Sequence, residues 1–272
     1  MVWKHITGYS TMEKKYLCRL CHQYVTEQEI SEEHYPAHSV GNDDIVAVDI
    51  GKFVDSFLSE ETYEKLVIGM HNGKSIKEIA EQLFDEKISI PLYPKGRTAK
   101  TLCRKCNTFF GHYDKAYLKF YNANGDPSTV KGFQKSTKLA IIKAIFGKFL
   151  SVPEASNEHF DFIDFLTNES CDTYQGVWHL YFIRRDFSSD IMGMADIGTG
   201  KVEFDEGLVY EMSDDKFIFD LMNFEKHSEF EMNSIFDLLG DHYSLITGVG
   251  ENGGYHAQIL MSRMFRTAFD GQ

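Results

Sequence analysis

The sequence predicts an α+β protein with a cysteine-rich first part and a mixed second part that contains an antiparallel sheet. Two Cys-x-x-Cys pairs lie in the first part, and four runs rich in Tyr, Phe, Val and Ile follow residue 175. These runs predict an antiparallel meander, because strands favour such residues and the Gly and Asp breaks between them favour turns. They cover Gly176–Arg184, Ile191–Ile197, Val202–Met212 and Lys216–Leu221. We expect a first domain over 1–127, with a helical insert at about 43–100, and an α+β accessory domain over 128–272.

The composition is that of a folded protein of one or two domains. The chain has 272 residues, of which 43% are hydrophobic and 25% are charged, which excludes wholesale disorder and a small disulfide-held scaffold. The apolar stretch Leu139–Leu150 is too short and contains two lysines, so it does not predict a transmembrane helix. No signal-peptide pattern opens the sequence. We therefore expect a cytoplasmic protein with no membrane partner.

Charge is distributed unevenly along the chain. The formal net charge is -13, which by itself disfavours a nucleic-acid partner. Between Lys95 and Lys148, however, there are twelve Lys or Arg residues and two acidic ones, whereas 151–272 contains 7 basic and 23 acidic residues. A basic block in an acidic chain indicates a surface that binds a polyanion, although a solvated lysine-rich surface would give the same count. We expect the acidic C-terminal half to regulate the first domain, to form a homodimer or to bind a protein partner.

Four of the five cysteines form two pairs with the same spacing, Cys18-x-x-Cys21 and Cys103-x-x-Cys106. Two residues between ligands let a tight turn direct both sulfurs to one point, and two such turns complete the tetrahedral thiolate site that Zn²⁺ prefers. The alternatives are a redox-active pair, which lacks its usual βαβ surroundings here, and coincidence. The spacing therefore predicts structural zinc.

Residues suited to metal binding and proton transfer follow both cysteine pairs. Glu33 and His34 come after the first pair, and Asn107 directly follows Cys106. If zinc joins the two pairs, these segments become neighbours. Glu33 and the Asn107 side-chain oxygen are hard donors that suit Mg²⁺ or Mn²⁺, and His34 could take a proton from an attacking water. The alternatives are a solvated Glu33 in an acidic loop and Asn107 as the N-cap of the following helix.

These motifs together resemble those of the HNH, or ββα-metal, endonucleases. The matching segments are Cys-x-x-Cys, Glu33-His34-Tyr35-Pro36, and Cys103 to Asn107 with Gly111 and Asp114 behind them. The subtype is similar to the zinc-stabilised phage endonuclease VII group and to bacterial HNH proteins, and the resemblance covers about residues 15–121. It implies a ββα-metal (His-Me finger) core with Glu33 and Asn107 as ligands of the catalytic ion, His34 as general base, and Cys18, Cys21, Cys103 and Cys106 as ligands of structural zinc.

The resemblance implies a metal-dependent endonuclease that hydrolyses phosphodiester bonds of nucleic acid, expected to be DNA, with a role in bacterial defence or in a mobile element. Three features depart from the pattern: the cysteine pairs are separated by 81 residues, the acid is Glu rather than Asp, and where many members place another His ligand on the final helix, only His112 is near Asn107. The alternative is a catalytically inactive zinc module that binds nucleic acid or a protein. Phosphate contacts are expected from the basic residues around the second pair, which are Lys95, Arg97, Lys100, Arg104 and Lys105.

Local patterns predict the helices of the first part. Ser59 could cap a helix over Glu60–His71, and Ser75 with Glu78 forms a capping box for a second helix. The two helices resemble the first half of a helix-turn-helix, but no basic recognition helix follows, so a helical hairpin is the plainer interpretation. Further helices are expected over Asn107–Tyr121 and Thr137–Leu150.

Overall fold

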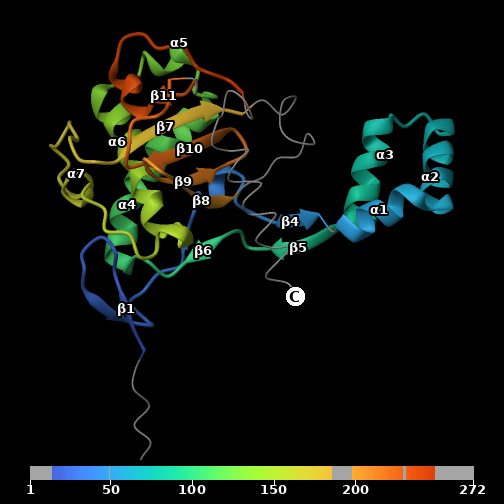
Figure 1. Cartoon of the computed structure of the whole chain (residues 1–272), viewed down its shortest axis with the longest axis horizontal. Helices are drawn as coiled ribbons and strands as arrows, with labels where there is room; N and C mark the ends of the chain where they lie inside the picture. The colour runs from blue at the N-terminus through green and yellow to red at the C-terminus, as the bar shows by residue number, and fades with distance from the viewer. Residues whose placement is uncertain (1–13, 49, 186–197, 229–230, 249–272) are drawn as a thin grey trace, which may run out of the picture. The chain divides into compact units, whose positions relative to one another are not determined.

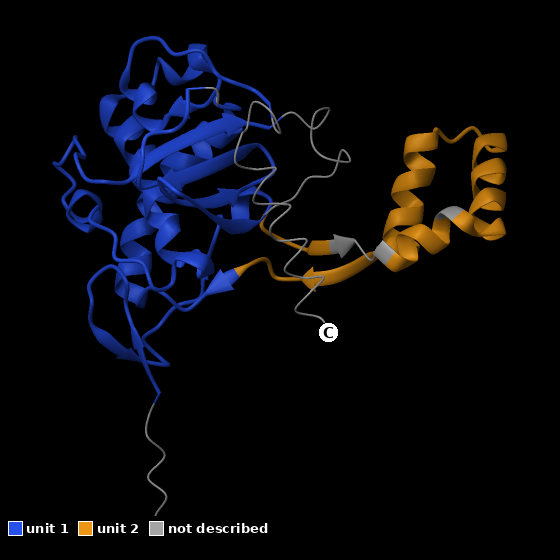
Figure 2. Cartoon of the chain, viewed as in Figure 1, with its two compact units in different colours: residues 1–41, 98–272 blue, residues 42–97 orange. Residues whose placement is uncertain are grey.

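The computed structural model describes residues 14–48, 50–185, 198–228 and 231–248, and the strand expected at Ile191–Ile197 lies outside them. The chain divides into two compact units, residues 42–97 and residues 1–41 together with 98–272 (Figure 2). Each unit combines helices with antiparallel strands, which confirms the predicted α+β class. Within the described ranges, no helix has both the length and the apolar character that a membrane span requires.

The unit formed by residues 42–97 is a two-stranded antiparallel sheet with three helices between its strands (Figure 1). Ser59 caps α2, and Ser75 with Glu78 forms the expected capping box of α3. The first helix, α1, was not predicted from the sequence. The elements are β4 (Ile45–Val48), α1 (Ile50–Leu58), α2 (Glu60–His71), α3 (Ile76–Leu83), a π-helical turn (Phe84–Ile88) and β5 (Ser89–Tyr93).

The two ends of this unit are tied together by Asn42. Its Nδ2 donates to the Arg97 carbonyl at 3.0 Å, and its Oδ1 accepts from the Arg97 N–H at 2.6 Å. Gly96 has a φ of +74°, and a Cβ on it would lie 2.1 Å from the Asn42 carbonyl oxygen. Only glycine fits here, because any side chain would break the close approach that these hydrogen bonds require.

In the other unit, two short strand pairs and one long helix surround the cysteines. β1 (Lys15–Leu17) and β2 (Tyr24–Thr26) form a hairpin around the first pair. β3 (Glu33–His34) pairs antiparallel with β6 (Thr98–Ala99), and α4 (Arg104–Asn122) follows β6 directly. The residues between β3 and β6 include the whole of the helical unit. The chain therefore presents two paired strands and then a helix, with an insertion between the strands.

A five-stranded antiparallel sheet completes this unit, which confirms that the C-terminal part contains such a sheet. The run predicted as one strand, Val202–Met212, instead forms two paired strands with a turn between them. Its strand order is β11-β7-β10-β9-β8. The strands are β7 (His179–Arg184), β8 (Thr199–Phe204), β9 (Gly207–Ser213), β10 (Phe217–Met222) and β11 (Asn233–Ser234), and the accompanying helices are α5 (Pro127–Val130), α6 (Lys135–Lys148) and α7 (Ile163–Thr167).

The helices α4 and α6 share one hydrophobic core with the sheet. The ring of Phe120 on α4 lies 4.9 Å from that of Phe217 on β10 and 5.9 Å from that of Phe182 on β7. A Cβ on Gly147 would lie 2.6 Å from Phe110, so α6 approaches α4 closely at that point. The boundary that we predicted between 127 and 128 falls between these two helices. Because core packing is dense, the position of α4 is fixed by the sheet as well as by the cysteines.

Candidate metal centre and its surroundings

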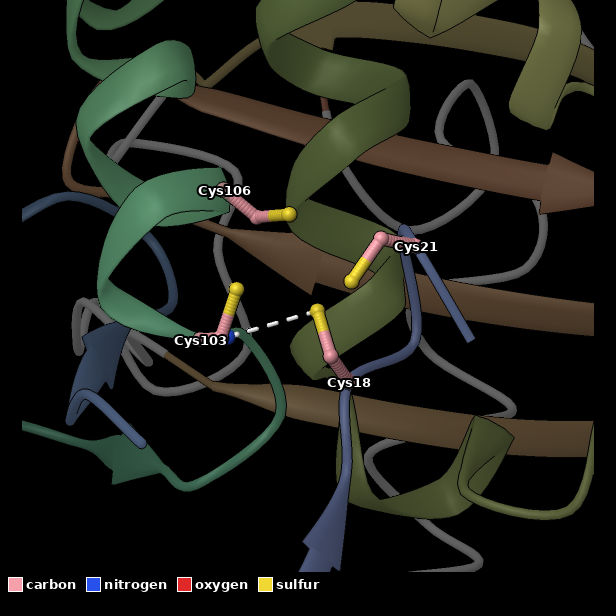
Figure 3. A group of neighbouring side chains, drawn as sticks. All are labelled: Cys18, Cys21, Cys103 and Cys106. Atoms are coloured by element: carbon pink, nitrogen blue, oxygen red, sulfur yellow. Dashed lines mark hydrogen bonds between the residues drawn. The ribbon is translucent and has the colours of Figure 1, made fainter. Parts of the chain in front are cut away.

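The structure brings the two cysteine pairs together. The four sulfur atoms of Cys18, Cys21, Cys103 and Cys106 lie within 4.8 Å of one another (Figure 3). In a tetrahedral zinc site with Zn–S bonds of about 2.3 Å, the sulfurs would be about 3.8 Å apart. Among the described residues, this is the one group of three or more His, Cys, Asp or Glu side chains close enough to hold a metal ion. The four thiols could therefore hold zinc.

The local backbone geometry directs the four cysteine sulfurs toward one another. The first pair forms a tight turn in which the His22 N–H donates to the Cys18 carbonyl at 2.8 Å, and His22 has a φ of +56°. Cys103 is the N-cap of α4, so Cys106 lies one turn into the helix on the same side. The Cys103 N–H donates to the Cys18 sulfur at 3.3 Å and links the two pairs directly.

The thiols are crowded in a way that favours a bound cation. Cys18, Cys103 and Cys106 are buried, and Cys21 is exposed. Burial opposes ionisation of Cys18, but N–H donors from Cys103, Cys21 and Leu20 outweigh it and lower the pKa of this thiol. Burial and the neighbouring cysteines raise the pKa of Cys106. Four thiolates cannot coexist here without a compensating positive charge, and Zn²⁺ supplies that charge. The donor set thus fits zinc.

Arg19 anchors the first cysteine pair to the core of its unit. Its guanidinium donates to the carbonyls of Leu150, Ala155 and Glu158 at 2.7, 2.6 and 3.1 Å. It also lies over the Phe160 ring, 5.5 Å from the centroid. These carbonyls follow α6 in the chain, so one side chain joins the β1–β2 hairpin to the end of that helix. The sequence gave no signal for this contact, because all three acceptors are backbone groups more than a hundred residues away.

Glu33 lies in a buried ion cluster. It is 3% exposed and forms a salt bridge with Lys148 of α6. The Lys148 ammonium also contacts Asp114 of α4 at 3.0 Å. Burial opposes the charge of this ammonium, but the two carboxylates outweigh it and raise the pKa of Lys148. Lys148 therefore lies between the two acids, a position that the sequence did not indicate.

His34 lies on β3, and Asn107 lies on α4 directly after Cys106. His34 is half-buried on β3, with its ring centroid 5.3 Å from that of His38. Asn107 is half-buried in the first turns of α4, where its N–H donates to the Cys103 carbonyl at 2.9 Å, so it is not the N-cap. Asp114 is seven residues further along the same flank, about 10 Å along the axis. Between the described residues, no hydrogen bond joins Asn107 to Glu33 or His34.

The basic residues predicted to contact phosphates fall in both units. Lys95 and Arg97 belong to the 42–97 unit, and the Arg97 guanidinium lies over the Tyr93 ring, 4.6 Å from its centroid. Lys100 forms a salt bridge with Glu27. Arg104 and Lys105 are exposed at the start of α4. Lys100 and Arg104 also line an open depression of about 410 Å³, together with Glu27, Ile30, Ser31 and Glu32.

Comparisons with protein-family models, with curated proteins and with solved structures find no match to this chain.

Proposed function

We propose that the unit formed by residues 1–41 and 98–272 is a zinc-stabilised endonuclease of the ββα-metal type that hydrolyses phosphodiester bonds of DNA. The observation that carries the proposal is the cysteine cluster, because it joins the β1–β2 hairpin, which leads into β3, to the start of α4, which follows β6. That arrangement has the order of a ββα unit, with the acid–histidine pair on the first strand and the asparagine on the helix. The residues match the sequence motif in the same order.

In this proposal, zinc has a structural role. Cys18, Cys21, Cys103 and Cys106 would bind it, and it would supply the folding energy that joins the β1–β2 hairpin to α4. His34 would accept a proton from the attacking water, since imidazole side chains titrate near neutral pH. Arg104 and Lys105, one helical turn or less from Asn107, would hold the phosphates of the substrate.

The proposed catalytic Mg²⁺ or Mn²⁺ fits the described side chains less well than zinc does. Glu33 would be one of its ligands, yet its carboxylate is held by the Lys148 ammonium. Asp114, the second acid beside it, is held by the same ammonium. Glu33 can bind a divalent ion only after Lys148 has moved away. We therefore retain Glu33 and Asn107 as proposed ligands of the catalytic ion. Whether cleavage requires Mg²⁺ or Mn²⁺ tests that role.

The same ion pair favours a second candidate function. A zinc module whose acid is neutralised by a buried lysine would bind nucleic acid or protein without cutting it. The two candidates differ in one property, hydrolysis, because both retain the cysteine cluster and the basic side chains of α4.

Incubation of the purified protein with supercoiled plasmid and Mg²⁺ or Mn²⁺ tests the proposal. Wild type should nick the plasmid, and His34→Ala should lower the rate by at least about a hundredfold, because general-base catalysis contributes that much. His159→Ala is the matched control, since His159 is exposed and lies outside the candidate site. Zinc content and circular dichroism verify that both variants are folded. Equal rates for wild type and His34→Ala would refute a catalytic His34, and binding without cleavage would support the inactive module.

A further inference from the structure

The exposed face of α4 has an unusual composition for an acidic protein. The chain has a net charge of -13, yet no exposed position of this helix is acidic. Four of these positions carry Lys or Arg and one carries His. In chain order the exposed residues are Arg104, Lys105, Thr108, His112, Lys115, Lys119 and Asn122.

The spacing of these residues places their charges along the helix. Lys105, His112 and Lys119 follow one another at intervals of seven residues, which returns almost to the same side of an α-helix. Lys115 lies on the same exposed face, one turn before Lys119. The row from Lys105 to Lys119 is about 21 Å long, since each residue adds about 1.5 Å. That length spans the rise of about six successive phosphates in one strand of duplex DNA.

The charges on this face are not neutralised by their neighbours. The single acid of α4, Asp114, is turned to Lys148. Among the described residues, Lys105, Lys115 and Lys119 form no salt bridge, whereas Lys148 and Lys135 of α6 both do. Their positive charge is therefore available to an anion from solution.

We propose that the exposed face of α4 binds the phosphate backbone of duplex DNA. The inference deepens the proposed function by naming the surface that holds the substrate. A straight row of lysines complements a regular row of phosphates. Proteins that hold single strands also use exposed aromatic side chains on which bases stack, and no Phe, Tyr or Trp occupies an exposed position of this helix. Asn107 lies on the flank next to this face, so a bound backbone would run beside the candidate site.

Binding of a short fluorescent DNA duplex, measured by anisotropy without divalent ions, tests this inference independently of cleavage. The variant carries Lys105→Gln, Lys115→Gln and Lys119→Gln together. We expect its dissociation constant at about 0.15 M salt to rise at least tenfold. Each lysine that contacts a phosphate adds about one to the slope of log affinity against log salt, so the slope should fall by about three.

The matched control removes three exposed lysines that lie elsewhere, through Lys74→Gln, Lys77→Gln and Lys131→Gln. It has the same net charge as the test variant and should bind like wild type. Equal loss in both variants would overturn the inference, because net charge alone would then explain binding. Tighter binding to single-stranded DNA, duplex RNA or anionic vesicles than to duplex DNA would overturn it as well. Binding that depends on these lysines in a protein that cuts nothing would uphold this inference while the proposed hydrolysis fails.

Discussion

The helices α4 and α6 are both rich in lysine, but they use it in opposite ways. On α4, Lys105, Lys115 and Lys119 are exposed and form no salt bridge with a described residue. On α6, three of the four lysines are buried, and all four have partners. Lys135 pairs with Asp172, Lys138 donates to the Gly240 carbonyl, Lys143 donates to the Asn168 carbonyl, and Lys148 contacts Glu33 and Asp114.

The difference shows that a count of charges along a sequence does not measure a binding surface. Several of the twelve basic residues between Lys95 and Lys148 pair with groups of the protein itself, among them Lys100 and the four lysines of α6. A buried ammonium must have a partner, because its desolvation costs several kcal/mol. The three buried lysines of α6, Lys138, Lys143 and Lys148, therefore hold the fold, and those of α4 are left for an external anion.

The largest effect is expected from Lys148→Met. This change leaves the buried carboxylate of Glu33, with Asp114 beside it, without a compensating charge, so we expect a loss of about 3–5 kcal/mol in the free energy of unfolding. Urea denaturation followed by circular dichroism measures it. The double variant Glu33→Leu/Lys148→Met should recover part of the loss, because it removes both charges. A double variant that is less stable than Lys148→Met alone would contradict an ion pair at this position.

A buried carboxyl that contacts α4, that of Asp214, predicts that the stability of the fold depends on pH. Burial raises the pKa of Asp214 to about 7, although it accepts hydrogen bonds from the Tyr117 hydroxyl and from the N–H groups of Lys216 and Phe217. In the unfolded chain the same carboxyl ionises near pH 4. Folding thus retains a proton between about pH 4 and 7, and over this range stability should fall by up to about 4 kcal/mol as the pH rises.

Asp214→Asn isolates this contribution. Its amide can accept from both backbone N–H groups and donate to the Tyr117 hydroxyl, so the contacts are retained without a charge. The variant should lose less stability than wild type between pH 4 and 7, as measured by thermal unfolding across that range. Identical pH profiles for the two proteins would show that Asp214 does not control this dependence.

Lys143→Met should cost less than Lys148→Met, although both lysines are buried on α6. The Lys143 ammonium donates to one neutral carbonyl, that of Asn168, at 2.7 Å, and lies over the Phe165 ring. Its removal leaves the Asn168 carbonyl still accepting from the Cys171 N–H and strands no charge, so we expect a loss of about 1 kcal/mol in urea denaturation. A cost equal to that of Lys148→Met would indicate that burial of the ammonium, rather than its acidic partners, sets the penalty.

The smallest effect on stability is expected from Lys119→Gln on the exposed face of α4. The side chain contacts solvent, and surface substitutions of this kind scarcely change the free energy of unfolding. The urea midpoint should stay at the wild-type value. A clear fall would place Lys119 among the lysines that hold the fold and would remove the contrast between the two helices.

Local signals in the sequence were sufficient for much of the fold. The caps at Ser59 and Ser75 marked the starts of α2 and α3, because a capping side chain and its helix are only three residues apart. The repeated Cys-x-x-Cys spacing predicted that both cysteine pairs meet, and the structure confirms that they do. The helix α1 was missed, although the strand before it, β4, is present.

The buried ion cluster around Glu33 could not be predicted from local signals in the sequence. Its partner Lys148 is 115 residues away, and the sequence of α6 gives no sign that Lys148 points inward. The same limit applies to Arg19, whose acceptors are backbone carbonyls that any residue could provide. Side-chain partners at this sequence separation are set by tertiary packing, which a single sequence does not display.

The proposed function depends on the four thiols binding one zinc ion, because that ion would join the β1–β2 hairpin to the start of α4. X-ray absorption spectroscopy at the zinc edge of the purified protein tests this most directly. We predict one zinc per chain, surrounded by four sulfur atoms at about 2.3 Å. A protein purified without chelators that contains no zinc, or a zinc ion with nitrogen or oxygen ligands in place of sulfur, would contradict it.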